Sequence, residues 1–155
     1  MKGDKKVTDT LNSLLARELT VVSQYMVHTD MCENWGYGKL HEAIQKRAKV
    51  EMKHAEKLIG RIIFLDGIPV VNKLEKMHIG ADIPQMFNND HEAEIDASNR
   101  YNASILICGN AKDYATREIL EVILNEEDGH IDDIEEVQYQ IKQMGIQQFL
   151  SILVS

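Results

Sequence analysis

Apolar residues recur along four long stretches of this chain at alternating steps of three and four positions, the period of an amphipathic α-helix. The first stretch shows the pattern at Leu11, Leu15 and Val22. Only two prolines and nine glycines interrupt the 155 residues. We therefore predict helices at about 5–34, 39–65, 83–110 and 114–143, and the apolar segment after Gly145 predicts a short fifth helix at about 147–153.

The connections between these helices differ in length, and the difference predicts the topology. Residues 35–38 and 109–110 are short and contain glycine, so they join antiparallel neighbours. The 17 residues from Asp66 to Asp82 are too many for a simple turn. They can cover the roughly 39 Å needed to return along the bundle. We predict one all-α domain over residues 1–155, a four-helix bundle with a long crossover between the second and third helices and a short C-terminal fifth helix.

Six polar residues interrupt the inward-facing stripes, and they form an internal repeat. Each half of the chain has a glutamate followed 33 positions later by Glu-x-x-His, and a shift of 76 positions superposes the halves. The matched pairs are Glu18 with Glu94, Glu51 with Glu127, and His54 with His130. Because residues three apart share a helix face, all six side chains should point into the bundle.

Buried ionised carboxylates need partners, because at low dielectric they repel one another. No lysine lies on the inward stripes at the height of the glutamates, and Arg47 is a full turn from Glu51. Two divalent cations would balance four carboxylates, and mixed oxygen and imidazole ligands suit iron, manganese or zinc. Six protein ligands for two metals leave open positions at which an oxidant can bind. Solvated surface glutamates aligned by accident are the opposing interpretation, which the twofold occurrence of the motif disfavours.

Two further pairs of residues also repeat. Tyr25 and Tyr101 follow Glu18 and Glu94 by two turns, so they fit either hydrogen-bond partners of ligating carboxylates or ordinary core tyrosines. Cys32 and Cys108 should lie ~42 Å apart on helices that run in opposite directions. A disulfide requires Cα atoms within ~7 Å, so we interpret both as core cysteines.

Composition narrows the classes of function. A formal net charge of −8 argues against nucleic-acid binding. No apolar run approaches the ~20 residues of a membrane helix. The first ten residues, MKGDKKVTDT, lack the apolar stretch of a secretory signal. Two cysteines without Cys-x-x-Cys make neither a disulfide framework nor a zinc site. We expect a cytoplasmic protein with neither nucleic acid nor membrane as a partner.

The six-residue set, the crossover and the short last helix resemble those of bacterioferritins, over essentially the whole chain. The resemblance implies a ferritin-like bundle that assembles into a hollow cage of 24 identical subunits, built from two-fold dimers. It also implies that the six residues are a catalytic ferroxidase centre that binds two iron ions per subunit. That centre would oxidise Fe(II) with dioxygen or hydrogen peroxide, and the Fe(III) would be stored as mineral. A small ferredoxin is the implied partner for iron release.

Met52 carries a second feature of the resemblance. It follows Glu51 and therefore projects about 100° away from the metal-facing stripe. Its counterpart in the repeat is Asp128, so the symmetric core does not require it. In bacterioferritins a methionine at this place binds haem b between two subunits, one thioether from each. Taken alone, the residue fits a surface methionine equally well.

Two residues of this chain differ from those of some bacterioferritins, and the difference bears on the storage mechanism. Certain bacterioferritins carry a histidine and an acid near the first Glu-x-x-His as an auxiliary iron site, and this chain has Lys46 and Val50 there. Iron itself, rather than electrons, is then expected to cross into the cavity.

One rival function is a di-iron peroxidase or oxidase without storage, with or without haem, although the Cys-x-x-Cys domain usual in rubrerythrins is missing from this sequence. Another is a haem or electron-transfer cage whose dinuclear site is structural.

Overall fold

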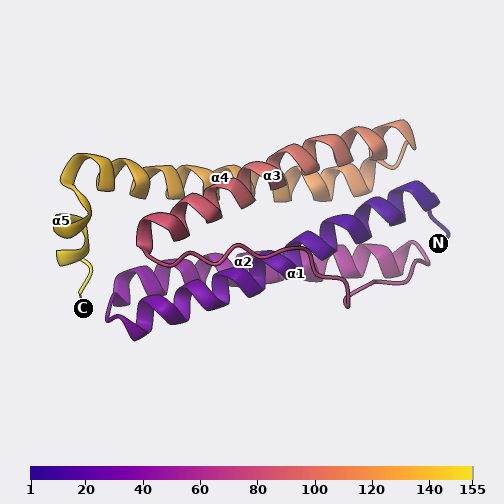
Figure 1. Ribbon diagram of the computed structural model, residues 1–155. Coiled ribbons are helices and arrows are strands. Elements are labelled where there is room, and N and C mark those ends of the chain that lie inside the picture. Colours follow the sequence, from indigo (N-terminus) through magenta and orange to yellow (C-terminus); the bar gives the residue numbers. More distant parts are fainter. Residues whose placement is uncertain (155) are drawn as a thin grey trace.

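The computed structural model describes residues 1–154 and confirms the all-α fold class. Four long helices, α1 (Lys5–Asn34), α2 (Gly38–Phe64), α3 (Ile83–Asn110) and α4 (Tyr114–Met144), form the bundle. A short α5 (Ile146–Ser151) lies across one end of it, and the N-terminus lies at the other end (Figure 1). The first four helices begin and end within about one residue of the predicted bounds. The fifth is shorter than 147–153 because its last residues form a turn.

An aspartate side chain caps the N-terminus of three of the long helices. Asp4 accepts hydrogen bonds from the backbone N–H groups of Lys6 and Val7, and so satisfies donors that the first turn of α1 cannot use. Asp82 caps α3 in the same way, and Asp113 caps α4. Each of these three helices therefore begins at a defined residue.

The two tight turns follow the internal repeat. Gly36, between α1 and α2, has a φ of 83°, and Lys112, its counterpart 76 positions later, has a φ of 57°. The next residue in each turn donates its N–H to the carbonyl of the cysteine five positions before it, at 2.9 Å in both cases. The repeat therefore includes the turn geometry as well as the helices.

The apolar core is divided into two groups of buried side chains. One group surrounds Leu11, Leu58 and Leu120, and the other surrounds Ile44, Phe87 and Ile134. Cys32 and Cys108 are buried free thiols in different groups, as expected of core cysteines. On every long helix the polar residues of the repeat fall between the two groups, so a polar layer crosses the middle of the bundle.

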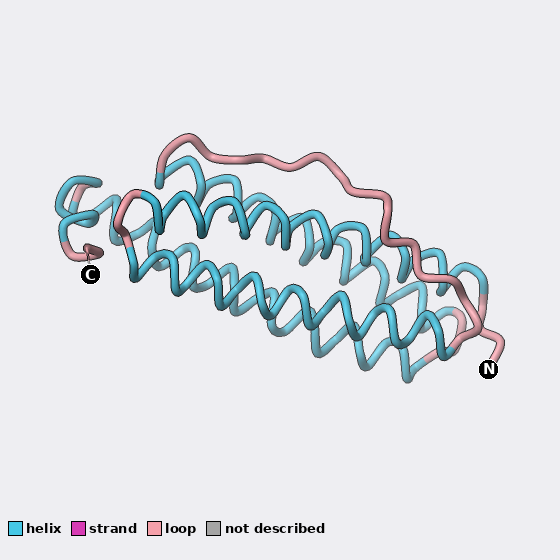
Figure 2. Tube along the Cα trace, turned by 90° about the horizontal axis from the view of Figure 1, so that it is seen from below, coloured by secondary structure: helices cyan, strands magenta, loops and turns pink. Residues whose placement is uncertain are grey.

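The crossover of residues 65–82 runs back along the length of the bundle, so α2 and α3 point the same way (Figure 2). Polar side chains of α1 hold its backbone. Asn12, Thr20, Gln24 and His28 accept hydrogen bonds from the N–H groups of Val70, Glu75, His78 and Gly80, at 2.9, 2.7, 3.0 and 3.0 Å. The spacing of these residues, a multiple of four, places them on one face of α1. That polar face, rather than turn chemistry, holds the loop.

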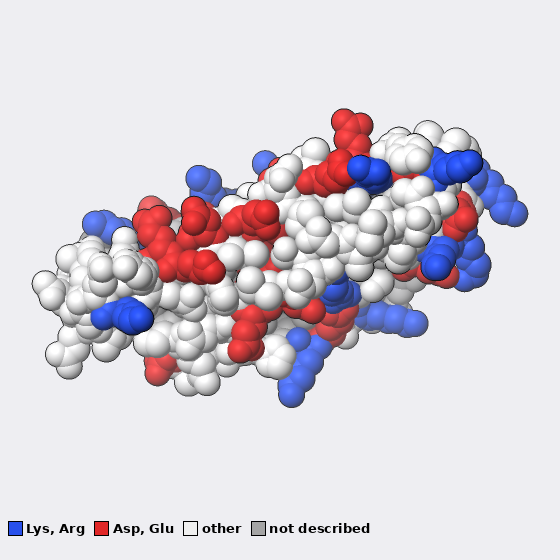
Figure 3. Space-filling view, turned by 90° about the horizontal axis from the view of Figure 1, so that it is seen from above, with Lys and Arg blue, Asp and Glu red and all other residues white. Residues whose placement is uncertain are grey.

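The surface is unevenly charged. Asp and Glu side chains gather over the middle of one face, and Lys and Arg side chains are denser toward the end that carries the N-terminus (Figure 3). At the opposite end α5 buries Phe149, whereas Ile152 stays half exposed. Within residues 1–154 none of the helices is both long and apolar enough to span a bilayer.

Candidate metal centre

The six residues of the repeat meet in the polar layer. One glutamate comes from α1, one from α3, and a Glu-x-x-His pair from each of α2 and α4. Five of the side chains are fully buried, and His130 is 8% exposed. The buried five are Glu18, Glu51, His54, Glu94 and Glu127.

The six side chains divide into two groups of four, and within each group one ligand atom per residue lies within 4.8 Å of the others. Glu51 and Glu127 belong to both groups. Glu18 and His54 complete one group, and Glu94 and His130 complete the other. The same 76-position shift exchanges the two groups. Each group could hold one metal ion, and the two ions would then share Glu51 and Glu127 as ligands.

Both imidazoles turn Nδ1 toward the carboxylates. His54 Nδ1 lies 3.0 Å from Glu127 Oε1, and His130 Nδ1 lies 2.9 Å from Glu51 Oε1. The other ring nitrogen of His54, Nε2, lies 2.6 Å from a carboxylate oxygen of Glu126. A carboxylate on the second ring nitrogen fixes the orientation of a ligating imidazole, so Nδ1 is the atom presented for coordination.

Both repeated tyrosines hydrogen-bond to the cluster. Tyr101 on α3 donates its hydroxyl to Glu18 on α1 at 2.6 Å, and Tyr25 on α1 donates to Glu94 on α3. Burial, and then the charge of the neighbouring carboxylate, raises the pKa of each tyrosine well above its usual value. Both hydroxyls therefore keep their protons and act as donors. Sequence reasoning left this contact open against plain core packing.

Arg17 is the residue that sequence reasoning missed. Its side chain is only 3% exposed, and the guanidinium reaches all four glutamates. Nη1 lies 2.9 Å from Glu127, 3.2 Å from Glu18 and 3.3 Å from Glu51, and Nη2 lies 3.6 Å from Glu94. Because Arg17 precedes Glu18, it starts off the inward stripe. Its long side chain curves back toward the inward stripe, so the guanidinium reaches the glutamates although the Cβ atom points away from them.

The electrostatics of the cluster separate the glutamates into two kinds. Burial would raise the pKa of Glu18, but Arg17 and His54 outweigh it and lower that pKa to about 2. The pKa of Glu94 also falls well below its usual value, because Arg17 and His130 outweigh burial. Burial and the charges of the other carboxylates raise the pKa values of Glu51 and Glu127 well above normal. In the metal-free protein the two shared carboxyls therefore hold their protons more tightly than an ordinary carboxyl does.

Two observations fit a pair of divalent cations. The buried Glu18 Oε2 and Glu94 Oε2 have no hydrogen-bond partner, which is unusual for buried polar atoms. The ligand set, four carboxylates and two imidazoles, is the one that dinuclear iron or manganese sites use in helical bundles. Metal binding would give these oxygens partners and would displace the protons of Glu51 and Glu127.

The other residues singled out from the sequence lie outside the cluster. Met52 is 40% exposed on the outward side of α2. Lys46 and Val50 line a cavity between α2 and α4 together with His130. The remaining histidines have other partners: His28 holds Gly80, His41 contacts Thr29, His91 contacts Glu135, and the His78 backbone joins Gln24.

Comparison with known proteins agrees with this geometry. Residues 8–144 match the family model described as a ferritin-like domain. The chain is 37% identical to a bacterioferritin of Brucella melitensis, over 87% of this chain and 84% of the relative. It is 38% identical to one from Rhodobacter capsulatus, with the same shares covered. It is 33% identical to one from Mycolicibacterium paratuberculosis, over all of this chain and 98% of the relative.

Proposed function

We propose that this chain, which belongs to the bacterioferritin family of ferritin-like proteins, oxidises Fe(II) at its buried Glu/His cluster and stores the Fe(III) product. The observation that carries the proposal is the pair of four-residue groups that share Glu51 and Glu127. A single structural metal would need only one such group. Two groups with shared carboxylates suit two ions that react together.

Iron is the substrate in this proposal, and two Fe(II) ions supply one electron each to dioxygen or hydrogen peroxide. The residues of the chain hold and position these ions. Glu18 with His54 and Glu94 with His130 bind one ion each, and the shared carboxylates hold the two close together. Tyr101 and Tyr25 orient the outer carboxylates through their hydroxyls.

The product leaves, in our proposal, on the side of His130. Of the six cluster residues only His130 retains exposure, and it lines two cavities between α2 and α4. Asp133 lines both cavities as well, so an acidic side chain is available along the way. Lys46 and Val50 offer no ligand set there, which favours movement of iron over transfer of electrons across the wall.

Storage requires an enclosed space, which one chain does not provide. Family membership supports an oligomeric cage, and we assign 24 copies in two-fold dimers to this protein on that basis. With −8 per chain such a cage carries about −190 charges, which draws Fe(II) toward it at low ionic strength. The exposed apolar side chains of Ile152 and Val154, which follow α5, would be covered by other subunits.

Aerobic loading with Fe(II), followed by absorbance and by particle mass, tests the function. Ferrous iron is added in portions of two ions per chain. A storage ferroxidase shows a rapid oxidation phase with each portion, and its mass rises far beyond two irons per chain. A di-iron peroxidase or oxidase without storage oxidises iron, but its mass stops rising at two ions per chain. No rapid oxidation at all would leave only a structural metal or haem cage.

A further inference from the structure

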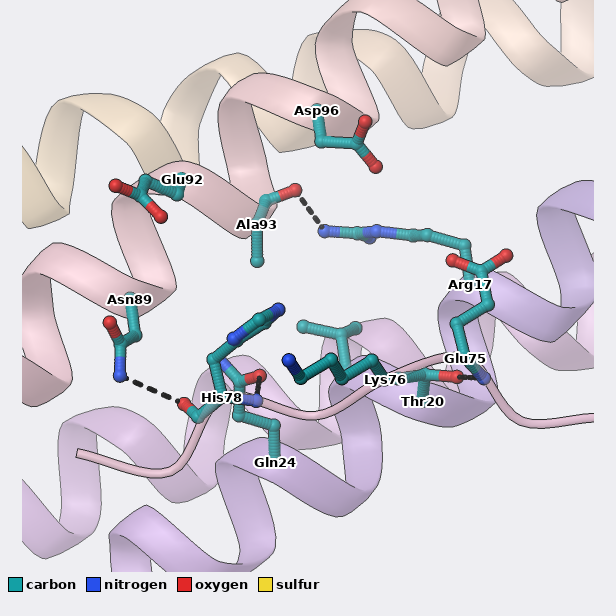
Figure 4. A pocket seen from close by; sticks show the side chains of 11 residues that line it. Arg17, Thr20, Gln24, Glu75, Lys76, His78, Asn89, Glu92, Ala93 and Asp96 are labelled. Atoms are coloured by element: carbon teal, nitrogen blue, oxygen red, sulfur yellow. Dashed lines mark hydrogen bonds between the residues drawn. The ribbon is translucent and has the colours of Figure 1, made fainter.

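The guanidinium of Arg17 lies between the glutamates and a cavity on the opposite side of the bundle from the His130 exit. Its Nη1 donates to carboxylate oxygens of three glutamates, and its Nη2 donates to the backbone carbonyl of Ala93 on α3 at 3.0 Å. Figure 4 shows the side chain crossing from α1 to α3 above the cavity. Arg17 is therefore both a partner of the cluster and part of the cavity wall.

The oxygens that Arg17 engages are the ones that two metal ions need. Its Nη1 bonds to oxygens of both shared carboxylates, Glu51 and Glu127, and to one of Glu18. Guanidinium and divalent cations cannot occupy this space together, because like charges a few ångströms apart repel strongly in a buried site. Guanidinium also stays protonated, so it cannot become neutral to make room.

We infer that Arg17 is a built-in competitor of iron, which holds the four glutamates together in the metal-free protein and must turn outward into this cavity before two ions bind. This inference rests on the proposed function, since it concerns occupation of the same cluster. It adds a positioning residue that controls the access and affinity of the metals. No bond is made or broken in the step; one positive side chain exchanges for two divalent ions.

The cavity can receive the side chain. Its volume is about 310 Å³, and it lies between α1, α3 and the crossover. Three acidic residues line it, Glu75, Glu92 and Asp96. Arg100 already pairs with Glu75 and Asp96, so Glu92 is the carboxylate that would receive the guanidinium after it leaves the cluster. Arg17 forms part of the wall between this cavity and the cluster. When its side chain turns outward, a path for ions would open through that wall.

Titration of the assembled, metal-stripped protein with Co(II) tests the inference without relying on catalysis. Cobalt(II) is a redox-stable probe whose visible absorption reports oxygen and nitrogen ligation. The variant Arg17→Gln removes the competing charge and keeps a polar side chain. The matched control, Arg117→Gln, removes an equal charge from a partly exposed arginine that forms an ion pair with Glu121 and lies over the Tyr114 ring. We expect Arg17→Gln to bind Co(II) roughly tenfold tighter or more, since a buried charge no longer opposes the ions, and Arg117→Gln to match the parent.

Two further measurements separate competition from a structural effect. The metal-free Arg17→Gln protein should melt below the metal-free parent, whereas the two Co(II)-loaded proteins should melt together. In stopped-flow mixing, the rate of Co(II) uptake by the parent should level off at high Co(II), because departure of the guanidinium is a unimolecular step. The rate for Arg17→Gln should keep rising. If that variant does not fold, Arg17→Lys keeps one charge but lacks the planar fork, and should bind Co(II) more tightly than the parent.

The outcomes distinguish this inference from the proposed function. If the parent binds two Co(II) per chain and removal of the Arg17 guanidinium leaves the affinity unchanged or weaker, Arg17 is not a competitor and the inference is wrong. The ferroxidase proposal would then survive. If the parent binds no Co(II) at the cluster, both proposals are wrong.

Discussion

At the scale of single residues, Glu51 and Glu127 hold a special place, because each contributes to both groups of ligands. In the proposed centre, loss of Glu18 or His54 would weaken one metal position, whereas loss of a shared glutamate would weaken both. Substitution of a shared glutamate should therefore reduce metal binding more than substitution of an unshared ligand. Among the glutamates, α2 and α4 supply the two shared ones, and α1 and α3 supply the two unshared ones.

The double variant Glu51→Ala/Glu127→Ala should lose rapid Fe(II) oxidation entirely, since neither metal position keeps its shared ligands. Glu18→Ala or His130→Ala should also abolish the fast phase by leaving one position incomplete. Stopped-flow absorbance after Fe(II) mixing measures this phase. Glu56→Ala, an exposed acid on α2, is the control and should oxidise iron like the parent. Parental rates in the double variant would remove the ferroxidase assignment.

The cluster also determines how stability depends on pH. Burial would lower the pKa of His54, but its hydrogen bonds to Glu127, Glu18 and Glu51 raise it well above the usual value. A raised folded-state pKa contributes stability that is fully present below the unfolded value of about 6.5 and is lost as pH rises. The raised pKa values of Glu51 and Glu127 act in the same direction from about pH 4.5 upward. The lowered pKa of Glu18 acts oppositely, and its contribution disappears as pH falls toward about 2.

We therefore expect the melting temperature of the metal-free protein to fall between pH 6.5 and pH 9, measured by circular dichroism in the presence of a chelator. His54→Asn should make the fall shallower. His91→Asn, which changes a histidine paired only with Glu135, should leave the slope unchanged. A melting temperature that rises over this range would contradict the raised pKa of His54.

At the scale of elements, α1 has two functions on two faces. One face contributes Glu18 and Tyr25 to the metal centre, and the neighbouring face holds the crossover through hydrogen bonds to its backbone. Arg100 on α3 adds an ion pair with Glu75 at 2.8 Å. The crossover therefore forms one wall of the cavity beside Arg17 rather than a free loop.

The variant Thr20→Val keeps the shape of the side chain but leaves the Glu75 N–H without its acceptor. Loss of one such part-buried hydrogen bond costs about 1 kcal/mol, and the crossover should open more often. Trypsin should then cut faster after the exposed Lys73 and Lys76. Thr10→Val is the matched control, because that hydroxyl bonds only to the Lys6 carbonyl of its own helix. Equal cleavage of the two variants would mean that Thr20 does not hold the crossover.

At the scale of the whole molecule, several features concern surfaces that a single chain leaves open. Met52 is 40% exposed in the middle of α2, and Ile152 and Val154, which follow α5, are exposed at one end of the bundle. A two-fold axis beside Met52 would bring two thioethers together as identical ligands to one haem. Haem b shared by two subunits and a ferredoxin that supplies electrons for iron release remain predictions from the family.

The variant Met52→Leu tests the haem prediction, since it keeps the side-chain volume and removes the sulfur. Purified cages should lose haem absorption and still oxidise Fe(II) rapidly, because Met52 does not belong to the cluster. The pyridine haemochrome spectrum gives haem per pair of chains, and stopped-flow mixing gives the oxidation rate. Met31→Leu, a half-buried methionine on α1, is the matched control. Full haem content in Met52→Leu would exclude this residue as the ligand.

The sequence alone determined the fold class, and periodicity explains why. Long helices with apolar stripes have few ways to pack, and the length of the segment before Asp82 allowed only a crossover. The six cluster residues could also be predicted, because the 76-position repeat places them on inward stripes. These properties are local or follow from spacing along one helix.

Only the tertiary structure decided which residues touch across helices. The tyrosines bond to the glutamate of the opposite helix, and the polar face of α1 finds its partners some 50 residues away. Arg17 shows most clearly which contacts the sequence pattern cannot predict. A stripe is defined by where Cβ points, but a guanidinium lies several bonds further out, and its position depends on the charges that the fold gathers. Four glutamates from four helices create a site for one positive side chain, and no spacing along one helix contains that information.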